Sequence, residues 1–489
     1  MRILSLRNEL ILITMLLITV SSVCSANTTS KACSSITYGT SENKIVFTFD
    51  KEYKCGQYTN GDWWVSVDST GVLKLVGVSP ASLDGLNGME LNPISKLTQG
   101  FDRRINGYNA GLDLKTPALI PSNSSVVKTI SLIPVKGKKC RPCIKYAAVL
   151  TVTGESVIES DHIFRPGYFG KKKKTYSLEH SVFERLLSLP ASCCSSVGKN
   201  DFNNISRRYQ GVMLDHLEGW VGRSLHPVDS MPDYGAQIAT DNAVSALRFL
   251  LDDFDPDKPS HKSALINYLQ MSIDLESMAA GGVSWPGKGG HGNGRKLPIL
   301  FAWYLFKNND FLAVLDNVSF SEDEQVYFSE KIGRPLYGAK CSDKRYWLTT
   351  ISGRGPRDCR DPYGFIDGGG HEIGGAYQVC CTAMPWKYTA LVIRLLGLEA
   401  EWGNSSFLNY VDRWVNHGVW AAPDPCAPYN GNMNEYLKNY GAKTDNSCIN
   451  GQGRYLRKHG TQKDAGNYRN MLGDQLWKAY RYAMNEEME

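Results

Sequence analysis

The feature that most constrains the fold is a change in the spacing of apolar residues near residue 166. Before this point, short runs such as Ile45–Phe49 are rich in β-branched and aromatic residues, which predicts strands. From about residue 177, apolar residues recur every three or four positions, as in Asp241–Phe254, which predicts amphipathic helices. We therefore expect two units, with Pro166-Gly167 and the lysine run 171–174 as the linker between them.

The two patterns together predict a fold class. Serial amphipathic helices separated by glycine-rich loops are typical of stacked helical hairpins, and no fixed sequence period supports a strict repeat protein. We expect a mainly α protein: an α/α toroid (a helical hairpin barrel) over residues 167–489, preceded by a small β-rich N-terminal domain over residues 27–166. A helical solenoid is the alternative. The expected strands are 45–49, 63–67, 72–76, 129–134 and 147–152, and the expected helices are 241–254, 261–279, 296–307, 322–332, 373–396, 407–419 and 468–484.

The first 26 residues resemble an export signal. Arg2 and Arg7 precede the uncharged run Leu10–Val20, and the small residues Ser25 and Ala26 follow at the expected cleavage site. The apolar run is shorter than the roughly 20 residues of a membrane-spanning helix. We expect residues 1–26 to be a cleaved signal peptide and the protein to be secreted, without a membrane partner; an uncleaved signal anchor is the alternative.

The cysteine content agrees with export. Cys24 leaves with the signal, so 12 of the 13 cysteines remain, an even number that favours disulfides in a secreted protein. Cys140 and Cys143 are spaced as half a zinc site, but no second such pair exists, which favours a structural bridge. Adjacent cysteines are expected to reach different partners, as at 193–194 and 380–381. Glycosylation sequons occur at Asn27, Asn123, Asn204, Asn317 and Asn404.

Charge and histidine content exclude some classes of function. The net charge of +5 is too small to indicate a nucleic-acid partner, and the basic run 171–174 has no interleaved aromatic residues, so it is interpreted as a solvated loop. The nine histidines are scattered and no HExxH motif occurs. We therefore predict neither a catalytic metal nor a cofactor.

Polar and aromatic residues gather in loops that precede the expected helices, at 232–242, 285–295, 354–377 and 425–432. In a toroid such loops converge on one cleft, and their glycines let the backbone approach a ligand closely. Asn and Arg side chains can bind a substrate carboxylate and make the adjacent C–H more acidic, while His or Tyr removes that proton and Tyr protonates the leaving oxygen. This set of groups matches β-elimination at a uronic acid, so an acidic polysaccharide is the expected partner.

Three segments carry a resemblance to a known family: Cys55–Trp64, the His291-Gly-Asn-Gly-Arg295 loop, and Gly368-Gly-Gly-His371-Glu372. Together they resemble the alginate and glucuronan lyases of polysaccharide lyase family 38, mainly over residues 200–440. The resemblance implies an α/α toroid and places the catalytic Asn, His, Arg and Tyr on Asn242, His291, Arg357 and Tyr363. Substrate-binding roles are expected for Trp285, Asn293, Arg295, Arg360, His371, Tyr377 and Tyr429.

Other interpretations of the same residues stay open. His371 could cap a helix, and the arginines at 354, 357 and 360 could pair with neighbouring aspartates. An inverting glycoside hydrolase needs two carboxylates roughly 6.5 to 9.5 Å apart, for which the candidates are Asp233, Asp241, Asp367 and Glu372. A secreted, non-catalytic glycan-binding protein would also suit the eleven tryptophans and the basic balance.

Overall fold

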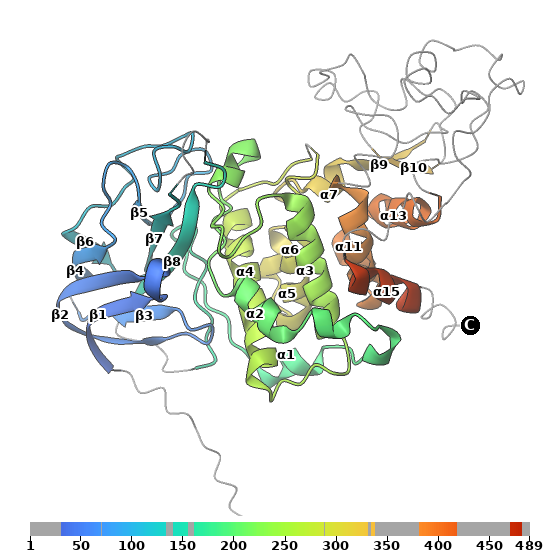
Figure 1. Cartoon of the computed structure of the whole chain (residues 1–489), viewed down its shortest axis with the longest axis horizontal. Coiled ribbons are helices and arrows are strands. Elements are labelled where there is room, and N and C mark those ends of the chain that lie inside the picture. The colour runs from blue at the N-terminus through green and yellow to red at the C-terminus, as the bar shows by residue number, and fades with distance from the viewer. Residues whose placement is uncertain are drawn as a thin grey trace, which may run out of the picture.

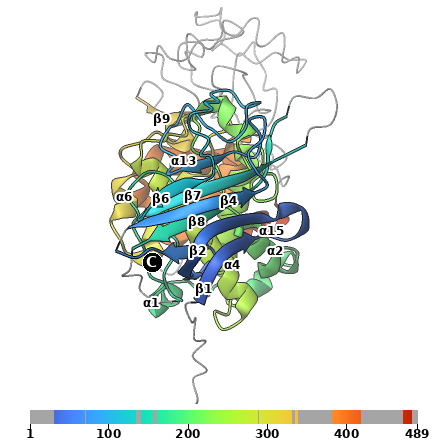
Figure 2. The ribbon, with the colours of Figure 1, turned by 90° about the vertical axis from the view of Figure 1, so that its left-hand side faces the viewer.

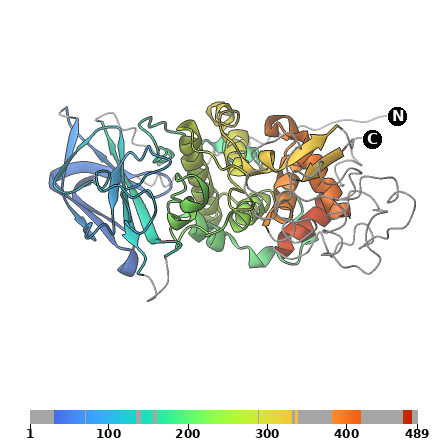
Figure 3. The ribbon, with the colours of Figure 1, turned by 90° about the horizontal axis from the view of Figure 1, so that it is seen from above.

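The computed structural model describes residues 31–69, 71–133, 140–154, 161–287, 289–330, 334–337, 381–417 and 470–481. Helix makes up 37% of the structure and strand 22%, and the N-terminal region is a large, nearly closed mixed β-sheet. The expectation of a mainly α toroid is therefore wrong. In Figures 1 and 3 the described helices follow one another along the long axis of the molecule, with the sheet at one end.

The sheet has eight strands in the order β5-β7-β8-β3-β2-β4-β6, with β1 added to β2 (Figure 2). All neighbours are antiparallel except β3 and β8, which run parallel, so the sheet is mixed. Every residue of β7 except Ile130 is buried, as expected for a strand covered on both faces. The strands are β1 (Lys31–Tyr38), β2 (Ile45–Gln57), β3 (Trp63–Ser66), β4 (Val72–Ser79), β5 (Met89–Leu91), β6 (Ala118–Pro121), β7 (Ser124–Ser131) and β8 (Ile144–Thr153).

One face of the sheet shares its core with the helices. Val127 of β7 and Ile144 and Val149 of β8 belong to the same buried cluster as the side chains of the central helices. A separate cluster, with Phe47 and Leu150 among its members, fills the other side of the sheet. Apolar periodicity shows which face of a helix is buried but not what covers it, and here a sheet covers part of the helical layer. This is why the sequence pattern did not reveal the architecture.

The helices of the remaining chain pack in pairs (Figure 1). Contacts join α2 to α4, α3 to α5 and α11, α4 to α5, and α11 to α13 and α15. Among the described helices, none combines the length and the apolar character that a bilayer crossing requires. The helices are α1 (His180–Glu184), α2 (Phe202–Tyr209), α3 (Gly235–Phe249), α4 (Pro259–Ala280), α5 (Lys296–Phe306), α6 (Asp310–Ala313), α7 (Ser321–Glu324), α11 (Ala383–Leu395), α12 (Glu399–Trp402), α13 (Ser405–His417) and α15 (Met471–Tyr480), with short 3-10 turns η1 (Ser41–Asn43), η2 (Ala191–Cys193), η3 (Val197–Lys199) and η4 (Gly219–Ser224).

Some predicted helices match closely and one does not. Helix α4 begins at Pro259, a residue suited to the first turn, and ends where Gly281-Gly282 follows. The helix expected over 322–332 is wrong: α7 ends at Glu324, and β9 (Val326–Ser329) pairs with β10 (Arg334–Tyr337). Val-Tyr-Phe in β9 favours a strand, and this local preference ends the helix after its acidic first turn.

The expected linker at Pro166-Gly167 is a buried joint. The Arg165 guanidinium is 1% exposed. It donates to Asp62, the residue before β3, at 2.5 Å and to both carboxylate oxygens of Asp274 in α4 at 2.9 and 2.6 Å. Because the two carboxylates come from the sheet region and from a helix, Arg165 ties the two regions together.

Every cysteine among the described residues is disulfide-bonded, namely Cys33 with Cys55, Cys140 with Cys143, Cys193 with Cys194, and Cys381. The 140–143 bridge agrees with the structural interpretation of that motif. The expectation that adjacent cysteines reach different partners is wrong at Cys193 and Cys194, which bond to each other at the end of η2. Cys380 lies outside the described residues.

Candidate functional site

The His291 loop, residues 281–295, joins α4 to α5 and is held from two sides. On one side, Gly294 N donates to Glu322 Oε1 of α7 at 2.6 Å. On the other, Gly290 N donates to the Tyr234 hydroxyl, just before α3, at 3.0 Å. The loop is therefore positioned by the starts of two helices that are far apart in sequence.

Two glycines let this loop lie directly against its neighbours. A Cβ on Gly235, the first residue of α3, would overlap the carbonyl oxygen of His291. A Cβ on Gly290 would overlap the carbonyl oxygen of Cys381. Both contacts are with backbone atoms, which cannot swing aside, so the position of His291 depends on these two glycines.

His291 lies in a narrow depression with a cavity volume of about 10 Å³, here called the His291 recess. The His291 ring is only 8% exposed, and Trp285, 5% exposed, stacks on Phe320 with the ring centroids 5.8 Å apart. The recess is built mainly from three segments, 215–226, 284–286 and 291–295. Its lining residues are Asp215, Leu217, Gly219, Gly222, Arg223, His226, Ser284, Trp285, Pro286, His291, Gly292 and Arg295.

A buried ion cluster forms one wall of the recess. Arg295 Nε donates to Asp215 Oδ2 at 2.7 Å, and a second guanidinium nitrogen lies 3.2 Å from Oδ1, a bidentate arrangement. Burial alone would raise the pKa of Asp215, but the Arg295 guanidinium and His226 outweigh it and hold that pKa well below the usual range. Arg295 also donates to the carbonyl oxygens of His291 and Asn293, so the cluster anchors the loop.

His226 is fixed at both ring nitrogens. Its Nε2 lies 3.1 Å from Asp215 Oδ1, and its Nδ1 lies 3.0 Å from the carbonyl oxygen of Pro232. Both partners are acceptors, so whichever ring nitrogen carries a hydrogen has an acceptor within reach. The wall therefore presents a surplus of hydrogen-bond donors around a single carboxylate.

An exposed aromatic ring stands at the edge of the recess. Trp220 is 53% exposed, and its ring meets the His291 ring edge-on at 5.7 Å between centroids. The guanidinium carbons of Arg223 and Arg141 lie 4.3 and 5.4 Å from its centroid. Arg223 also forms an ion pair with Asp233. We call Trp220, Arg141 and Arg223 the Trp220 platform; it offers a flat apolar surface flanked by cations.

Comparisons with protein-family models, with curated proteins and with solved structures give no match to this chain. Within the part of the chain that the structure describes, no group of three or more His, Cys, Asp or Glu side chains is placed to hold a metal ion. The chemistry of the recess and the platform therefore carries the functional assignment proposed below.

The structure places the two predicted asparagines behind the loop. Asn242 lies in the middle of α3 rather than at its start, where it was expected, and it is 1% exposed. Its amide donates to Gly294 O at 2.9 Å and accepts from the Tyr209 hydroxyl at 3.0 Å. Asn293, fully buried, donates to Cys381 O and accepts from Ser321. These amides support the loop from within and do not line the recess.

The remaining predicted residues divide into those that the structure describes and those that lie outside the described residues. His291, Trp285 and Arg295 line the recess together. Of the hydrolase carboxylates, Asp233 pairs with Arg223 at its edge, and Asp241 is mostly enclosed, so that burial raises its pKa. The other predicted positions lie outside the described residues: Arg357, Arg360, Tyr363, Asp367, His371, Glu372, Tyr377 and Tyr429.

Sequence reasoning missed the segment that supplies half of the recess lining. Residues 215–226 contribute Asp215, Arg223 and His226 to the lining, and Trp220 at its edge, from a stretch built around the turn η4. The signal was present, because charged and aromatic residues alternate there with Gly219 and Gly222, as in the loops that were selected. It was overlooked because no expected helix follows it directly.

Proposed function

We propose that this chain binds an acidic polysaccharide on the Trp220 platform and cleaves it by β-elimination at the His291 recess. The observation that carries the proposal is the edge-on contact between the His291 ring and an exposed tryptophan that has two arginines over its face. A uronic acid has an apolar ring face, a carboxylate and an acidic C–H beside it, and these three features match the ring, the cations and the imidazole.

The proposed steps follow the order of the chemistry. Arg223 and Arg141 bind the uronate carboxylate and stabilise the charge that develops when the neighbouring C5 proton leaves. His291 accepts that proton, the electron pair forms a C4–C5 double bond, and the C4–O bond breaks. The departing oxygen takes a proton from a tyrosine, which leaves an unsaturated uronate and a new chain end.

Tyr234 is the described tyrosine best suited to donate that proton. Its hydroxyl accepts a hydrogen bond from Gly290 N, next to His291, so its own proton remains available. The guanidinium carbon of Arg223 lies 4.8 Å from its ring centroid, which links it to the platform. Tyr363, the donor that the sequence resemblance implied, stays a prediction outside the described residues.

Hydrolysis has less support from the described part of the recess. Asp215 is the carboxylate in its lining, and both of its oxygens are bound by Arg295 or His226. An inverting hydrolase needs one carboxyl that holds a proton and another that activates water. A carboxylate whose pKa is held low by two donors suits neither role.

The test is incubation of the secreted protein with alginate, glucuronan, pectate and glycosaminoglycans. Elimination on one of them should produce ultraviolet absorbance from the unsaturated uronate in step with new reducing ends. New reducing ends without absorbance would replace the proposal with hydrolysis. Binding to one polymer with no new ends would leave a glycan-binding protein.

A further inference from the structure

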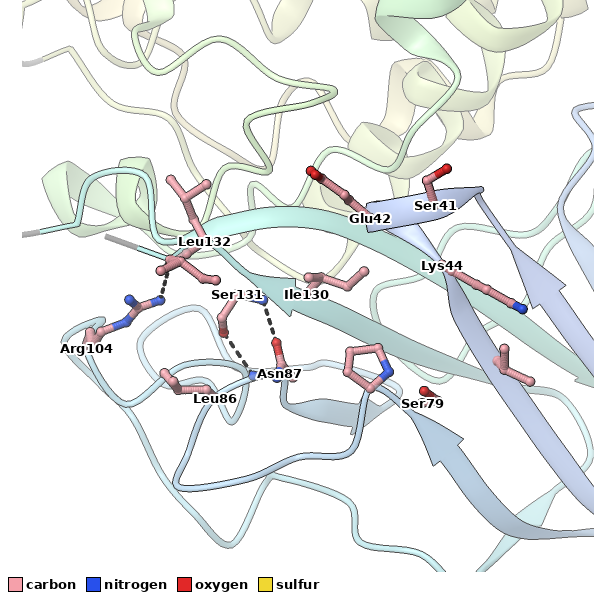
Figure 4. A pocket seen from close by; sticks show the side chains of 13 residues that line it. Ser41, Glu42, Lys44, Ser79, Leu86, Asn87, Arg104, Ile130, Ser131 and Leu132 are labelled. Carbon is pink, nitrogen blue, oxygen red and sulfur yellow. Dashed lines mark hydrogen bonds between the residues drawn. The ribbon is translucent and has the colours of Figure 1, made fainter. Parts of the chain in front are cut away.

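A second depression lies in the β region, and we call it the Lys44 groove. It has a volume of about 610 Å³, within the usual size range of ligand pockets. It opens between the start of β2, the end of β4 and the end of β7, and Figure 4 shows its two sides. The lining residues are Ser41, Glu42, Lys44, Val46, Ser79, Pro80, Leu86, Asn87, Arg104, Ile130, Ser131, Leu132 and Ile133.

The charges around this groove leave one cation available. Glu42 pairs with Lys145, and Arg104 is held by the buried carboxylate of Asp102. The Lys44 ammonium has no ion-pair or hydrogen-bond partner among the residues that the structure places. The groove therefore combines an aliphatic floor with one unneutralised positive charge at its edge, which favours an anionic occupant.

The groove and the His291 recess lie on either side of one disulfide loop, residues 140–143. From the groove, Arg104 donates to the carbonyl oxygen of Cys143 at 3.2 Å. From the same loop, Arg141 lies over Trp220, and Cys143 N donates to Ser224 O at the end of η4 at 2.8 Å. The Cys140–Cys143 bridge thus fixes a short, cation-bearing link between the two depressions.

We infer that the Lys44 groove is an additional subsite for the same acidic polysaccharide, occupied by units of the chain that extend past Arg141. The inference rests on the proposed function, because it takes the polymer from there. Lys44 binds a uronate carboxylate, and Pro80, Leu86 and Ile130 contact the apolar edges of the sugars. Short oligomers bind at the platform alone, so the groove contributes only to long ones.

The test compares alginate disaccharide with a long alginate oligomer, because only the latter can span both depressions. Lys44→Glu reverses the charge, and Leu86→Trp fills the groove. Each should weaken binding of the long oligomer by about fivefold, a change typical of one exposed ionic contact, and leave the disaccharide unchanged in calorimetry. Lys199→Glu, the same charge change on the exposed turn η3, should alter neither.

The outcomes separate the two proposals. If wild-type protein binds and cleaves alginate but Lys44→Glu and Leu86→Trp bind both lengths as wild type does, the groove is not a subsite. If Lys44→Glu weakens binding of the disaccharide and of the long oligomer equally, Lys44 acts through the overall electrostatic field of the protein, and the inference also fails. If no uronate polymer of the panel is bound or cleaved by the wild type, the proposed function fails first and the subsite fails with it.

Discussion

Two buried ion clusters in this chain combine carboxylates with basic side chains, but in opposite numbers. At the joint between sheet and helices, one guanidinium, Arg165, is shared by the carboxylates of Asp62 and Asp274. Behind the recess, one carboxylate, Asp215, is shared by Arg295 and His226. The joint has a surplus of acceptors and the recess wall a surplus of donors.

The surroundings complete the two clusters differently. At the joint, Tyr168 N donates to Asp274 at 3.2 Å and the Asn60 amide donates to Asp62 at 2.8 Å, so protein groups use the extra acceptors. At the recess, Arg223 adds a further cation to the lining and pairs with Asp233 at the edge. The recess lining therefore holds two arginines and one aspartate, whereas the joint holds one arginine and two aspartates.

The largest expected effect is on turnover, from His291→Ala. Loss of a general base typically lowers the rate by about 10² to 10⁴-fold, so absorbance at the unsaturated-product band should appear at that reduced rate. Stability should change little, because the loop backbone keeps its bonds to Arg295. His180→Ala, at a side chain 84% exposed, is the matched control and should keep full turnover. Wild-type turnover in His291→Ala would remove this residue from the reaction.

The two clusters can be compared directly with Asp215→Asn and Asp274→Asn. Each removes one charge from a buried pair, which typically destabilises a protein by about 3 to 5 kcal/mol, measurable by urea unfolding. At a temperature where both variants are folded, only Asp215→Asn should also lower kcat, because it releases His226 and the Arg295 contacts to the His291 loop. Equal losses of kcat in the two variants would mean that the recess cluster is merely structural.

The fold was partly predictable from local sequence. Helix α5 follows its expected range almost to the residue, since its apolar run is long and almost unbroken. The sheet was underestimated: β1 had no expected counterpart, and β2 continues to Gln57, well beyond the expected strand 45–49. Strand pairing and the disulfide between Cys33 in β1 and Cys55 in β2 depend on distant residues, which local patterns do not reveal.

The candidate site was predictable in its loop but not in its partners. The glycines around His291 were expected to let the backbone approach a ligand, but the structure shows Gly290 packed against the backbone of Cys381. Asn242 was expected at a helix start because the expected helix began at Asp241, but α3 already begins at Gly235. Asn242 therefore lies inside the helix, and its amide is a buried support for the His291 loop.

Glu322 gives a pH-dependent effect of intermediate size. Burial raises its pKa to about 7, and its Oε2 has no hydrogen-bond partner. The protonated Glu322 side chain contributes its full stabilisation below the unfolded pKa of about 4.5, and this contribution is lost as the pH rises through 7. Glu322→Gln keeps an acceptor for Gly294 N and cannot ionise. Relative to wild type it should therefore gain up to about 3 kcal/mol between those pH values, measured by urea unfolding at several pH values. A constant difference across that window would contradict the assignment.

The smallest expected effect tests whether the platform binds rather than reacts. Trp220→Ala removes the ring on which Arg141 and Arg223 rest, and we expect KM to rise about tenfold, equivalent to roughly 1.4 kcal/mol of binding, with kcat changed far less. Trp303→Ala is the matched control, because Trp303 in α5 also has a cation, Lys307, 4.7 Å from its ring centroid but is not part of the Trp220 platform. If both variants raise KM to the same extent, the loss of any surface ring beside a cation has this effect, and the Trp220 platform has no special role in binding. If Trp220→Ala lowers kcat as strongly as His291→Ala does, the ring acts by holding His291 in place, and the site must be redrawn without a separate binding platform.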